Sequence, residues 1–471
     1  MFVAVLLACF LFSAGVRYQQ FETWKQTPAA HFVGERPMMT TLDAPYWLRW
    51  AREYNEGTYG QKGALSNYPK NTETFQDRTI HQKFRDPPKI YSTSSSFSQP
   101  STSGAREINI RNVPLLSSII ALLAPFFNYN YYLTGTLLIP VLASLFILPL
   151  GIYFFRIGVP ASGLLGGLIG TFSGAYYMRS SIGRIDTDML NLFFPFLTAL
   201  FILLASGAKR ERSVLLYSTI AGLSLFLFHW WYPKAAFTLS FFVVFILSLF
   251  VHKIRLRTIL LSSILFVVCA QPATLISGLD SALSQLSRYF YIEKETLNIL
   301  NENITASASF PSTMTTISEV SKVPIDEVLK RVLSNLKFSW IGFIAFFGLA
   351  VIRWRVLLPL TPVLALGLFS ILSSNRFIMF LAPFIGIGLG WLLQLLVEGA
   401  FYVLTQRYKD TKTTHSASEK TKHSDTKVVT QRRKNTKGLK TQIPETGLGA
   451  TTPSTPHFSL SASHYLNWIR Q

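Results

Sequence analysis

Residues 184–207 read RIDTDMLNLFFPFLTALFILLASG, in which two carboxylates are followed at once by a long apolar run. Asp186 and Asp188 stand between an apolar run that ends at Tyr177 and another that begins at Met189. The whole chain has only 24 acidic residues, so such a pair beside an apolar run is uncommon. Carboxylates at the rim of a membrane indicate a site that holds a cation or works on a substrate.

Apolar runs repeat along the chain and predict its fold class. Of the 471 residues, 49% are hydrophobic and 14% are charged. The runs are about 18 to 25 residues long, which is the length that crosses a bilayer core. They predict an all-α fold, a polytopic membrane helical bundle of about ten spans with long external loops. The predicted spans are 1–20, 131–155, 159–178, 189–207, 213–231, 235–252, 256–275, 337–352, 355–373 and 376–400.

The first of these runs has two interpretations. A signal peptide is also apolar, but residues 1–20 lack a basic N-terminal region and an obvious small-residue cleavage site. We therefore favour an uncleaved membrane anchor.

Basic residues in the short loops predict how the chain is oriented. Loops rich in Lys and Arg face the cytoplasm according to the positive-inside rule. Four such loops alternate with loops that lack basic clusters, and they contain residue 156 and residues 209–212, 253–257 and 353–355. The external loops are then 21–130, 179–188, 229–234, 274–336 and 373–375. The carboxylate pair therefore lies on the external side.

The net charge of +20 does not indicate a nucleic-acid partner. Much of it lies in residues 405–440, where Lys, Arg, Ser and Thr mix without apolar periodicity. Beside so many spans, this pattern favours a solvated cytoplasmic tail that touches anionic lipid. Cys9 and Cys269 both fall inside predicted spans, so we expect neither a disulfide framework nor a cysteine-based metal site.

Six segments follow from these patterns. They are the first transmembrane span (1–20), the first external loop (21–130), a transmembrane bundle (131–275), a second long external loop (276–336), further transmembrane spans (337–404), and a basic tail with an incomplete C-terminal region (405–471). In the first loop, residues 39–53 predict a turn and an aromatic-rich helix, and residues 91–104 predict a disordered linker. The apolar run 113–127 is too short for a span and predicts a helix in the outer interface.

Three acidic positions on the predicted outer face indicate a metal site. Asp43 lies in the first loop, Asp186 and Asp188 form the pair, and Glu319 lies in the stretch TISEV at 316–320. Hard cations such as Mg²⁺ and Mn²⁺ prefer oxygen ligands, and no Cys or His cluster competes in this sequence. Taken singly, each carboxylate is better explained as a solvated loop residue or a helix N-cap, so only their convergence makes a site.

Two arginines and one aromatic turn lie on the same predicted face. Arg179 precedes Asp186 by seven residues and could orient a carboxylate. Arg376, at the outer start of the last span, either grips a phosphate or marks the membrane boundary. Residues 229–234, HWWYPK, form an aromatic turn for which anchoring in the interfacial belt is the simpler explanation.

Together these motifs resemble the catalytic subunit of oligosaccharyltransferases, the membrane enzymes that move a glycan from a polyprenyl-linked carrier to asparagine. The bacterial single-subunit branch is the most similar, and the resemblance covers about residues 1–400. It implies a glycosyltransferase architecture of the GT-C type. The matching motifs are Asp43 with YW at 46–47, YYMR at 176–179 before DTDML at 186–190, WWYP at 230–233, TISE at 316–319 and NRF at 375–377.

The resemblance implies a role for each acidic position. Asp43, Asp186 and Glu319 would ligate Mn²⁺ or Mg²⁺, with Asp188 beside them. Asp43 and Glu319 would also engage the acceptor amide, whose nitrogen is a poor nucleophile until its conjugation with the carbonyl is loosened. Arg179 would hold these carboxylates in place.

The resemblance also implies how the two substrates are bound. Arg376 would contact the pyrophosphate of the lipid-linked donor, while the metal stabilises charge on the departing diphosphate. Arg331 matches the arginine that, in the bacterial branch, pairs with an acidic residue two positions before the acceptor asparagine. An acceptor protein or peptide with an acidic extended sequon is therefore implied.

The chain departs from the family in three ways. No Trp-Trp-Asp motif of the C-terminal soluble domain occurs, and the spans are fewer than the family has. Residues 461–471 resemble the helix that in the family shortly precedes that domain. We therefore expect a truncated or internally deleted product, or a split enzyme whose second chain supplies the soluble domain.

The function we expect is metal-dependent, inverting transfer of an oligosaccharide from a polyprenyl-pyrophosphate carrier to asparagine. The expected location is the bacterial inner membrane, with the active site facing the periplasm or exterior. One alternative is a polyprenyl-phosphate-sugar glycosyltransferase that acts on lipid or hydroxyl acceptors, which needs neither Glu319 nor Arg331. An inactive truncated relic is another. A transporter would carry ionisable residues within its spans, and these spans carry almost none.

Overall fold

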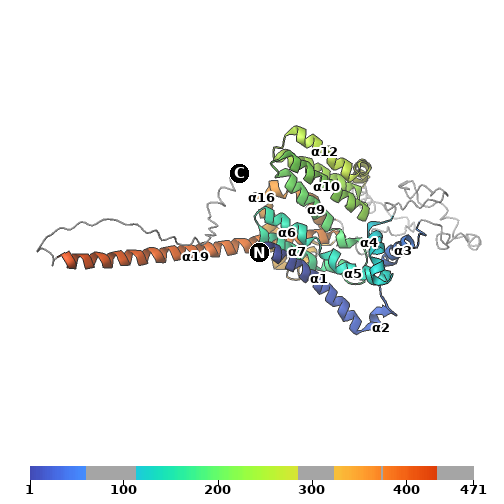
Figure 1. Ribbon diagram of the computed structural model, residues 1–471, viewed down its shortest axis with the longest axis horizontal. Helices are drawn as coiled ribbons and strands as arrows, with labels where there is room; N and C mark the ends of the chain where they lie inside the picture. The colour runs from blue at the N-terminus through green and yellow to red at the C-terminus, as the bar shows by residue number, and fades with distance from the viewer. Residues whose placement is uncertain (60–112, 285–322, 373–374, 432–471) are drawn as a thin grey trace, which may run out of the picture. The chain divides into compact units, whose positions relative to one another are not determined.

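A computed structural model describes residues 1–59, 113–284, 323–372 and 375–431 (Figure 1). Glu319, the predicted linker 91–104 and the segment 461–471 lie outside the described residues. The chain divides into two compact units, Met1–Ala400 and Phe401–Gln471. The described part of the second unit is helical through Gln431, where the sequence predicts a basic tail.

The predicted all-α fold is confirmed for the part of the chain that the structure describes, where a two-stranded hairpin is the exception. The main helices of the first half are α1 (Phe2–Gln26), α2 (Pro28–His31), α3 (Ala44–Asn55), α4 (Leu115–Leu123), η4 (Ala124–Phe127), α5 (Tyr131–Ser144), α6 (Ile147–Arg156), α7 (Pro160–Phe172), α8 (Gly174–Tyr177), η5 (Met178–Ser180) and η6 (Thr187–Leu190). They are followed by α9 (Phe193–Ser206), α10 (Glu211–Trp231), α11 (Ala235–Val251), α12 (Leu256–Ala270), α15 (Ile325–Val332), α16 (Leu336–Ile352), α17 (Trp354–Leu357), η8 (Leu358–Leu360), α18 (Thr361–Leu372), η9 (Asn375–Phe377) and α19 (Ile378–Gln431). The strands β1 (Phe32–Val33) and β2 (Arg36–Pro37) pair antiparallel.

Helices occupy all ten positions where the sequence predicts spans, but fewer are long enough to cross a membrane. By length and composition, six helices in the described ranges qualify, or up to eight if each of two bent helix pairs is one span. The glycine-rich α7 ends at Phe172 because Ser173 leaves the helical conformation, with ψ 136°. Helix α12 ends at Ala270, where Gln271 has a left-handed φ of 71° and Pro272 follows. The count of about ten spans therefore remains a prediction.

The short apolar run 113–127 forms a helix, as predicted, made of α4 and η4. The hydroxyl of Ser117 donates a hydrogen bond to the carbonyl of Trp47 in α3 at 2.8 Å. The indole N–H of Trp230, at the end of α10, donates to the carbonyl of Val113 at 2.7 Å. These contacts join α4 to the aromatic helix of the first loop and to the bundle.

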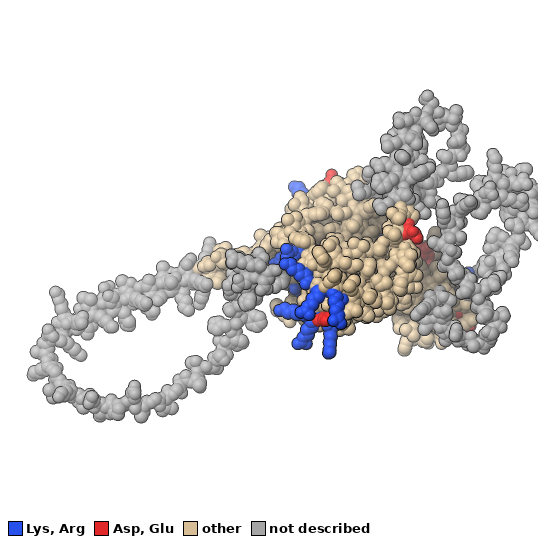
Figure 2. Space-filling model, turned by 90° about the horizontal axis from the view of Figure 1, so that it is seen from above, with Lys and Arg blue, Asp and Glu red and all other residues tan. Residues whose placement is uncertain are grey.

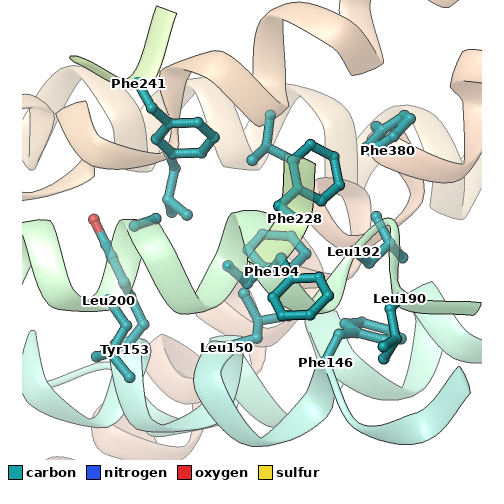
Figure 3. Close-up of a cluster of buried hydrophobic side chains, with 14 of the residues drawn as sticks. Phe146, Leu150, Tyr153, Leu190, Leu192, Phe194, Leu200, Phe228, Phe241 and Phe380 are labelled. Atoms are coloured by element: carbon teal, nitrogen blue, oxygen red, sulfur yellow. The ribbon is translucent and has the colours of Figure 1, made fainter. Parts of the chain in front are cut away.

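Phenylalanine side chains from different parts of the chain meet in the core of the bundle, together with many Leu, Ile and Ala side chains. Figure 3 shows Phe146, directly before α6, Phe194 of α9 and Phe228 of α10 in this cluster, and the rings of Phe194 and Phe228 have centroids 6.2 Å apart. On the outside, large apolar side chains such as Leu260 and Val268 are about 60% exposed, at 58% and 62%. An apolar outer surface of this kind is what lipid contact requires, so the chain is a membrane protein.

Basic side chains gather on one part of the surface. Figure 2 shows a dense group of Lys and Arg there with some acidic atoms among them, whereas the other visible acidic side chains lie apart from it. Lys209 and Arg210, in the loop between α9 and α10, and Arg212, in the first turn of α10, are all exposed. This asymmetry is the pattern on which the predicted orientation depends.

Helices α7 and α19 approach each other so closely that glycine is required where they meet. A Cβ atom at Gly386 would lie 2.6 Å from the carbonyl oxygen of Leu165 and 2.8 Å from the Cα of Gly166. We expect Gly386→Val to lower the free energy of unfolding by about 1–3 kcal/mol, because the helices would have to separate. Thermal unfolding in detergent micelles measures this change. The control is Gly15→Val in α1, where an added Cβ would have nothing within 4 Å, and an equal destabilisation of both variants would contradict the close approach.

Candidate functional site

The acidic loop between η5 and η6 is held by two other parts of the chain. The backbone N–H of Ile182 donates to the side-chain oxygen of Gln20 in α1 at 3.2 Å, and that of Thr40 donates to the carbonyl of Gly183 at 3.0 Å. Gly183 has a φ of 81°, and a Cβ there would lie 2.6 Å from the ring of Trp24. The loop that carries Asp43 is thus tied to the loop that carries the carboxylate pair.

Asp188 lies at the centre of the site and is completely buried, with 0% exposure. Its Oδ2 atom is 2.9 Å from Nη1 of Arg179, and its Oδ1 atom is 3.3 Å from Nη2 of Arg376. The side-chain amide of Asn191 donates to Oδ1 at 3.0 Å. A buried charge is stable only when it is paired in this way, so Asp188 holds together two arginines from distant parts of the chain.

Asp186 is also buried but has no arginine partner of this kind among the described residues. Its Oδ1 atom accepts hydrogen bonds from the backbone N–H of Thr187 at 2.6 Å and from the hydroxyl of Thr187 at 3.3 Å. Burial raises the pKa of Asp186, and the carboxylates of Asp188 and Asp43 raise it further, whereas the Thr187 N–H and Arg376 lower it. This excess of negative charge would be relieved by a cation at Asp186.

Two buried aromatic residues fix the backbone on either side of Asp188. The indole N–H of Trp231, in α10, donates to the carbonyl of Thr187 at 2.6 Å. The hydroxyl of Tyr176, in α8, donates to the carbonyl of Met189 at 2.9 Å. Both aromatic side chains are less than 2% exposed, so the position of Asp188 is set by packing as well as by charge.

Asp43 stands directly before α3 and is exposed. It is the N-cap residue of α3 by position, as one interpretation of the sequence predicts, but its side chain makes no capping hydrogen bond to that helix. Its carboxylate acts electrostatically on Asp186, which means that the two lie near each other. The structure therefore places Asp43 within electrostatic range of Asp186, and the convergence of Asp43, Asp186 and Asp188 into a site remains a prediction.

Cationic side chains border the carboxylates. Arg376, in η9, has a side chain that is 36% exposed although it reaches Asp188. Its Cζ atom lies 6.0 Å from the ring centroid of Tyr232, and Nζ of Lys234 lies 5.1 Å from the same centroid. Such an arrangement presents positive charge at the rim of a buried acidic group, which suits an anionic ligand such as a phosphate.

Arg331 lies in α15, and Nε pairs with Oε1 of Glu327 at 3.4 Å on an exposed surface. A Cβ at Gly174, the first residue of α8, would lie 3.4 Å from the carbonyl oxygen of Arg331. The structure therefore places α15 against the segment that carries Arg179. Glu319, the remaining predicted residue, lies outside the described residues.

The donor chemistry of the site fits a hard divalent cation. The ranges that the structure describes contain no group of three or more His, Cys, Asp or Glu residues arranged to hold a metal. Asp186 and Asp43 nevertheless offer carboxylate oxygens of the kind that such a cation prefers, and burial together with the neighbouring carboxylates raises the pKa of Asp186. Asp188 is already paired with two arginines, so its direct contribution as a ligand remains a prediction.

Four residues that support the site had no role in it assigned from the sequence: Arg17, Tyr176, Asn191 and Trp231. Trp231 was expected in the interfacial belt, but it is buried because its indole N–H serves Thr187. Arg17 did leave a visible signal, since an arginine inside an apolar run is unusual. Tyr176 belongs to the motif YYMR at 176–179, but its hydrogen-bond partner, like that of Asn191, is recognisable only in three dimensions.

A family model described as "Oligosaccharyl transferase STT3, N-terminal" matches residues 112–407 of the chain. Two similar curated proteins are both named undecaprenyl-diphosphooligosaccharide–protein glycotransferase and come from two strains of Campylobacter jejuni, RM1221 and serotype O:2. Each is 24% identical over 392 residues, which cover 74% of this chain and 50% of the relative. The chain thus spans about half the length of the curated relatives it matches.

Two solved structures from Archaeoglobus fulgidus are also similar. One is the archaeal oligosaccharyltransferase AglB in complex with an inhibitory peptide and a dolichol-phosphate, with a TM-score of 0.41 and 14% identity. The other is an oligosaccharyltransferase in the apo form, with a TM-score of 0.46 and 13% identity. Each match covers 62% of this chain and 43% of the solved chain.

Proposed function

This chain belongs to the STT3 family of oligosaccharyl transferases, and we propose that it transfers an oligosaccharide from a polyprenyl-pyrophosphate carrier to the asparagine of an N-glycosylation sequon. The observation that carries this proposal is the buried loop of Asp186 and Asp188, clamped by Arg179 and Arg376. The names of the Campylobacter relatives support the class of donor. The reaction is metal-dependent and inverting, with Mn²⁺ or Mg²⁺ as the cofactor.

The proposed reaction is a single displacement. The amide nitrogen of the acceptor asparagine forms a bond to the anomeric carbon, the bond from that carbon to the diphosphate oxygen breaks, and a carboxylate takes up the amide proton. Asp43 and Glu319 accept hydrogen bonds from the two amide N–H groups and thereby loosen the conjugation that makes the nitrogen unreactive. Direct attack from the face opposite the diphosphate inverts the configuration.

The other residues hold the reacting groups in place. Asp43, Asp186 and Glu319 would hold the divalent cation, with Asp188 beside them and oriented by Arg179. The bound cation would supply positive charge that stabilises the departing diphosphate. Arg376 binds the same diphosphate, which its partial exposure at the rim of the site supports.

The proposed location is the bacterial inner membrane, with the site facing the periplasm or exterior. The exposed basic loop between α9 and α10 supports this orientation, because basic loops stay on the cytoplasmic side. The proposed acceptor carries an acidic residue two positions before its asparagine.

The proposal is tested with the full-length protein in lipid nanodiscs, supplied with Mn²⁺, an undecaprenyl-pyrophosphate-linked oligosaccharide and a fluorescent peptide that contains an acidic sequon. We expect a glycosylated peptide, detected by its gel shift and by mass spectrometry. The control peptide has Gln in place of the acceptor Asn and should remain unmodified. Sugar transfer to a serine hydroxyl or to lipid, with none to asparagine, would instead support the polyprenyl-phosphate-sugar transferase alternative.

Arg331 provides a test of acceptor specificity. We expect Arg331→Ala to weaken the preference for an acidic residue two positions before the acceptor by about 1–3 kcal/mol, the value of one charge-assisted hydrogen bond. The ratio of kcat/KM for two peptides, with Asp or Ala at that position, measures this preference. Lys330→Ala is the matched control, since Lys330 is an exposed cation on the same helix. An unchanged ratio in Arg331→Ala would remove Arg331 from peptide recognition.

A further inference from the structure

Three charged side chains are buried among the residues that the structure describes, namely Arg17, Asp186 and Asp188. Asp186 and Asp188 belong to the candidate site, whereas the proposed function gives Arg17 no role. Arg17 lies in α1, a candidate membrane span, and its exposure is 0%. A cation buried in an apolar helix is unfavourable unless all its donors are satisfied, so such a residue is usually retained for a function.

Neutral oxygen atoms satisfy the guanidinium of Arg17, which forms no ion pair with a carboxylate in the described ranges. Its Nη1 donates to the hydroxyls of Ser13 and Thr171 at 3.0 and 2.9 Å. Its Nη2 donates to the carbonyl of Thr171 and the hydroxyl of Ser180, both at 2.9 Å, and Nε donates to the carbonyl of Ser180 at 3.1 Å. The five N–H donors of an arginine are thus used to hold backbone and hydroxyl groups.

The segment that Arg17 holds runs from Thr171 to Ser180. Thr171 lies in the last turn of α7, where carbonyl groups have no partner within the helix, and Ser180 ends η5. Between them the chain leaves the helical conformation at Ser173. Arg17 therefore joins the two ends of a bent segment, and its Cζ atom also lies 5.0 Å from the ring centroid of Tyr177 within that segment.

The segment from Thr171 to Ser180 carries Arg179 and Tyr176, the two residues of η5 and α8 that position Asp188. Arg179, which pairs with Asp188 at 2.9 Å, directly precedes Ser180, whose carbonyl and hydroxyl are both held by Arg17. The hydroxyl of Ser180 in turn donates to the carbonyl of Tyr176 at 2.8 Å. A shift of Ser180 would therefore move Arg179 and Tyr176 together.

We propose that Arg17 is a positioning residue of the site, which fixes the segment from Thr171 to Ser180 so that Arg179 reaches Asp188. The catalytic part of this inference rests on the proposed function, but the holding of the segment does not. Arginine suits the task because its five donors are spread over a planar fork, whereas a lysine has only three donors on one nitrogen.

The first experiment needs no activity. A nitroxide label is attached at Met178→Cys, an adjacent position that is 69% exposed, in full-length protein whose Cys9 and Cys269 are replaced by serine. Arg17→Met should give a clearly more mobile label, and Arg17→Lys an intermediate one. The control Lys25→Met removes an exposed cation from the same helix and should leave the label unchanged. An immobilised label in Arg17→Met would overturn the proposal.

If Arg17→Met does not fold, Thr171→Val replaces it, because this change removes one hydroxyl acceptor of Arg17 and keeps the charge buried with its other partners. A more mobile label in Thr171→Val then supports the proposal, and an unchanged label overturns it.

The second experiment separates positioning from stability. In the transfer assay, Arg17→Met should lower kcat about 10- to 100-fold, as a misplaced catalytic group does, and leave the KM for peptide nearly unchanged. In an Arg179→Met background, the same change should have little further effect, because both residues act through one ion pair. Additive effects of the two changes would overturn the route through Arg179. If even the unaltered protein transfers no glycan, the proposed function fails, whereas the label still decides whether Arg17 holds the segment.

Discussion

Asp188→Asn is expected to lower the free energy of unfolding by about 3–5 kcal/mol, because it leaves two guanidinium groups beside a buried neutral side chain. Asn and Asp have nearly the same shape, so the change isolates the charge that Arg179 and Arg376 now share. Since these arginines come from η5 and η9, their repulsion would separate two parts of the bundle. Unfolding curves in mixed detergent micelles measure the destabilisation.

The matched control for this prediction is Glu327→Gln, which removes the carboxylate of an exposed pair. Oε1 of Glu327 lies 3.4 Å from Nε of Arg331, and both side chains are more than 40% exposed, at 45% and 41%. A solvent-exposed pair of this kind contributes about 0–1 kcal/mol. Equal destabilisation of the two variants would mean that Asp188 is not the centre of a buried ion-pair network.

Asp186→Ala is expected to lower the rate of glycan transfer by about 100- to 1000-fold, the cost of removing a group that stabilises developing charge through a metal or directly. Stability should change much less, by about 1 kcal/mol, because the main interaction removed is the hydrogen bond from the Thr187 N–H. Chelation of divalent cations with EDTA should lower the rate of the unaltered protein to a similar level. Added Mn²⁺ should restore it.

Asp280→Ala serves as the control for Asp186→Ala, since Asp280 is an exposed carboxylate of the helix Pro272–Ser284. It should transfer glycan at the normal rate and respond to EDTA as the unaltered protein does. A folded Asp186→Ala protein that keeps most of its activity would remove Asp186 from the site. Activity that persists in EDTA would show that the proposed metal is not needed.

The loop that carries Asp43 and the loop that carries Asp186 and Asp188 illustrate how much of the candidate site could be predicted from the sequence. That Asp186 and Asp188 lie at one end of an apolar helical segment was predictable, because both come directly before an apolar run whose length is typical of a membrane span. That Asp43 lies near them followed from a resemblance, and the structure accounts for it with the hydrogen bond from Thr40 to Gly183. The ligand roles of Asp43, Asp186 and Glu319 remain predictions.

That the two carboxylates have different charged partners was not predictable from the sequence. The sequence placed Asp186 and Asp188 side by side with similar roles, whereas the structure gives Asp188 both arginines and leaves Asp186 without one among the described residues. The two side chains are separated by one residue, Thr187, and lie in different surroundings. Those surroundings come from α10, α8 and η9. No pattern within residues 184–190 contains this information.

The helical fold class, the apolar segments and the position of the acidic loop can all be predicted from the amino-acid sequence, because each depends on the length and spacing of neighbouring residues. The tertiary structure alone decided that Arg179 and Arg376 meet at Asp188, that Trp231 is buried against Thr187, and that Arg17 spans a bend in the chain. Arg376 and Asp188 are 188 residues apart, and Arg17 and Ser180 are 163 apart. Contacts over such separations arise only when helices pack, since a buried charge takes whichever partners the fold brings within hydrogen-bond distance.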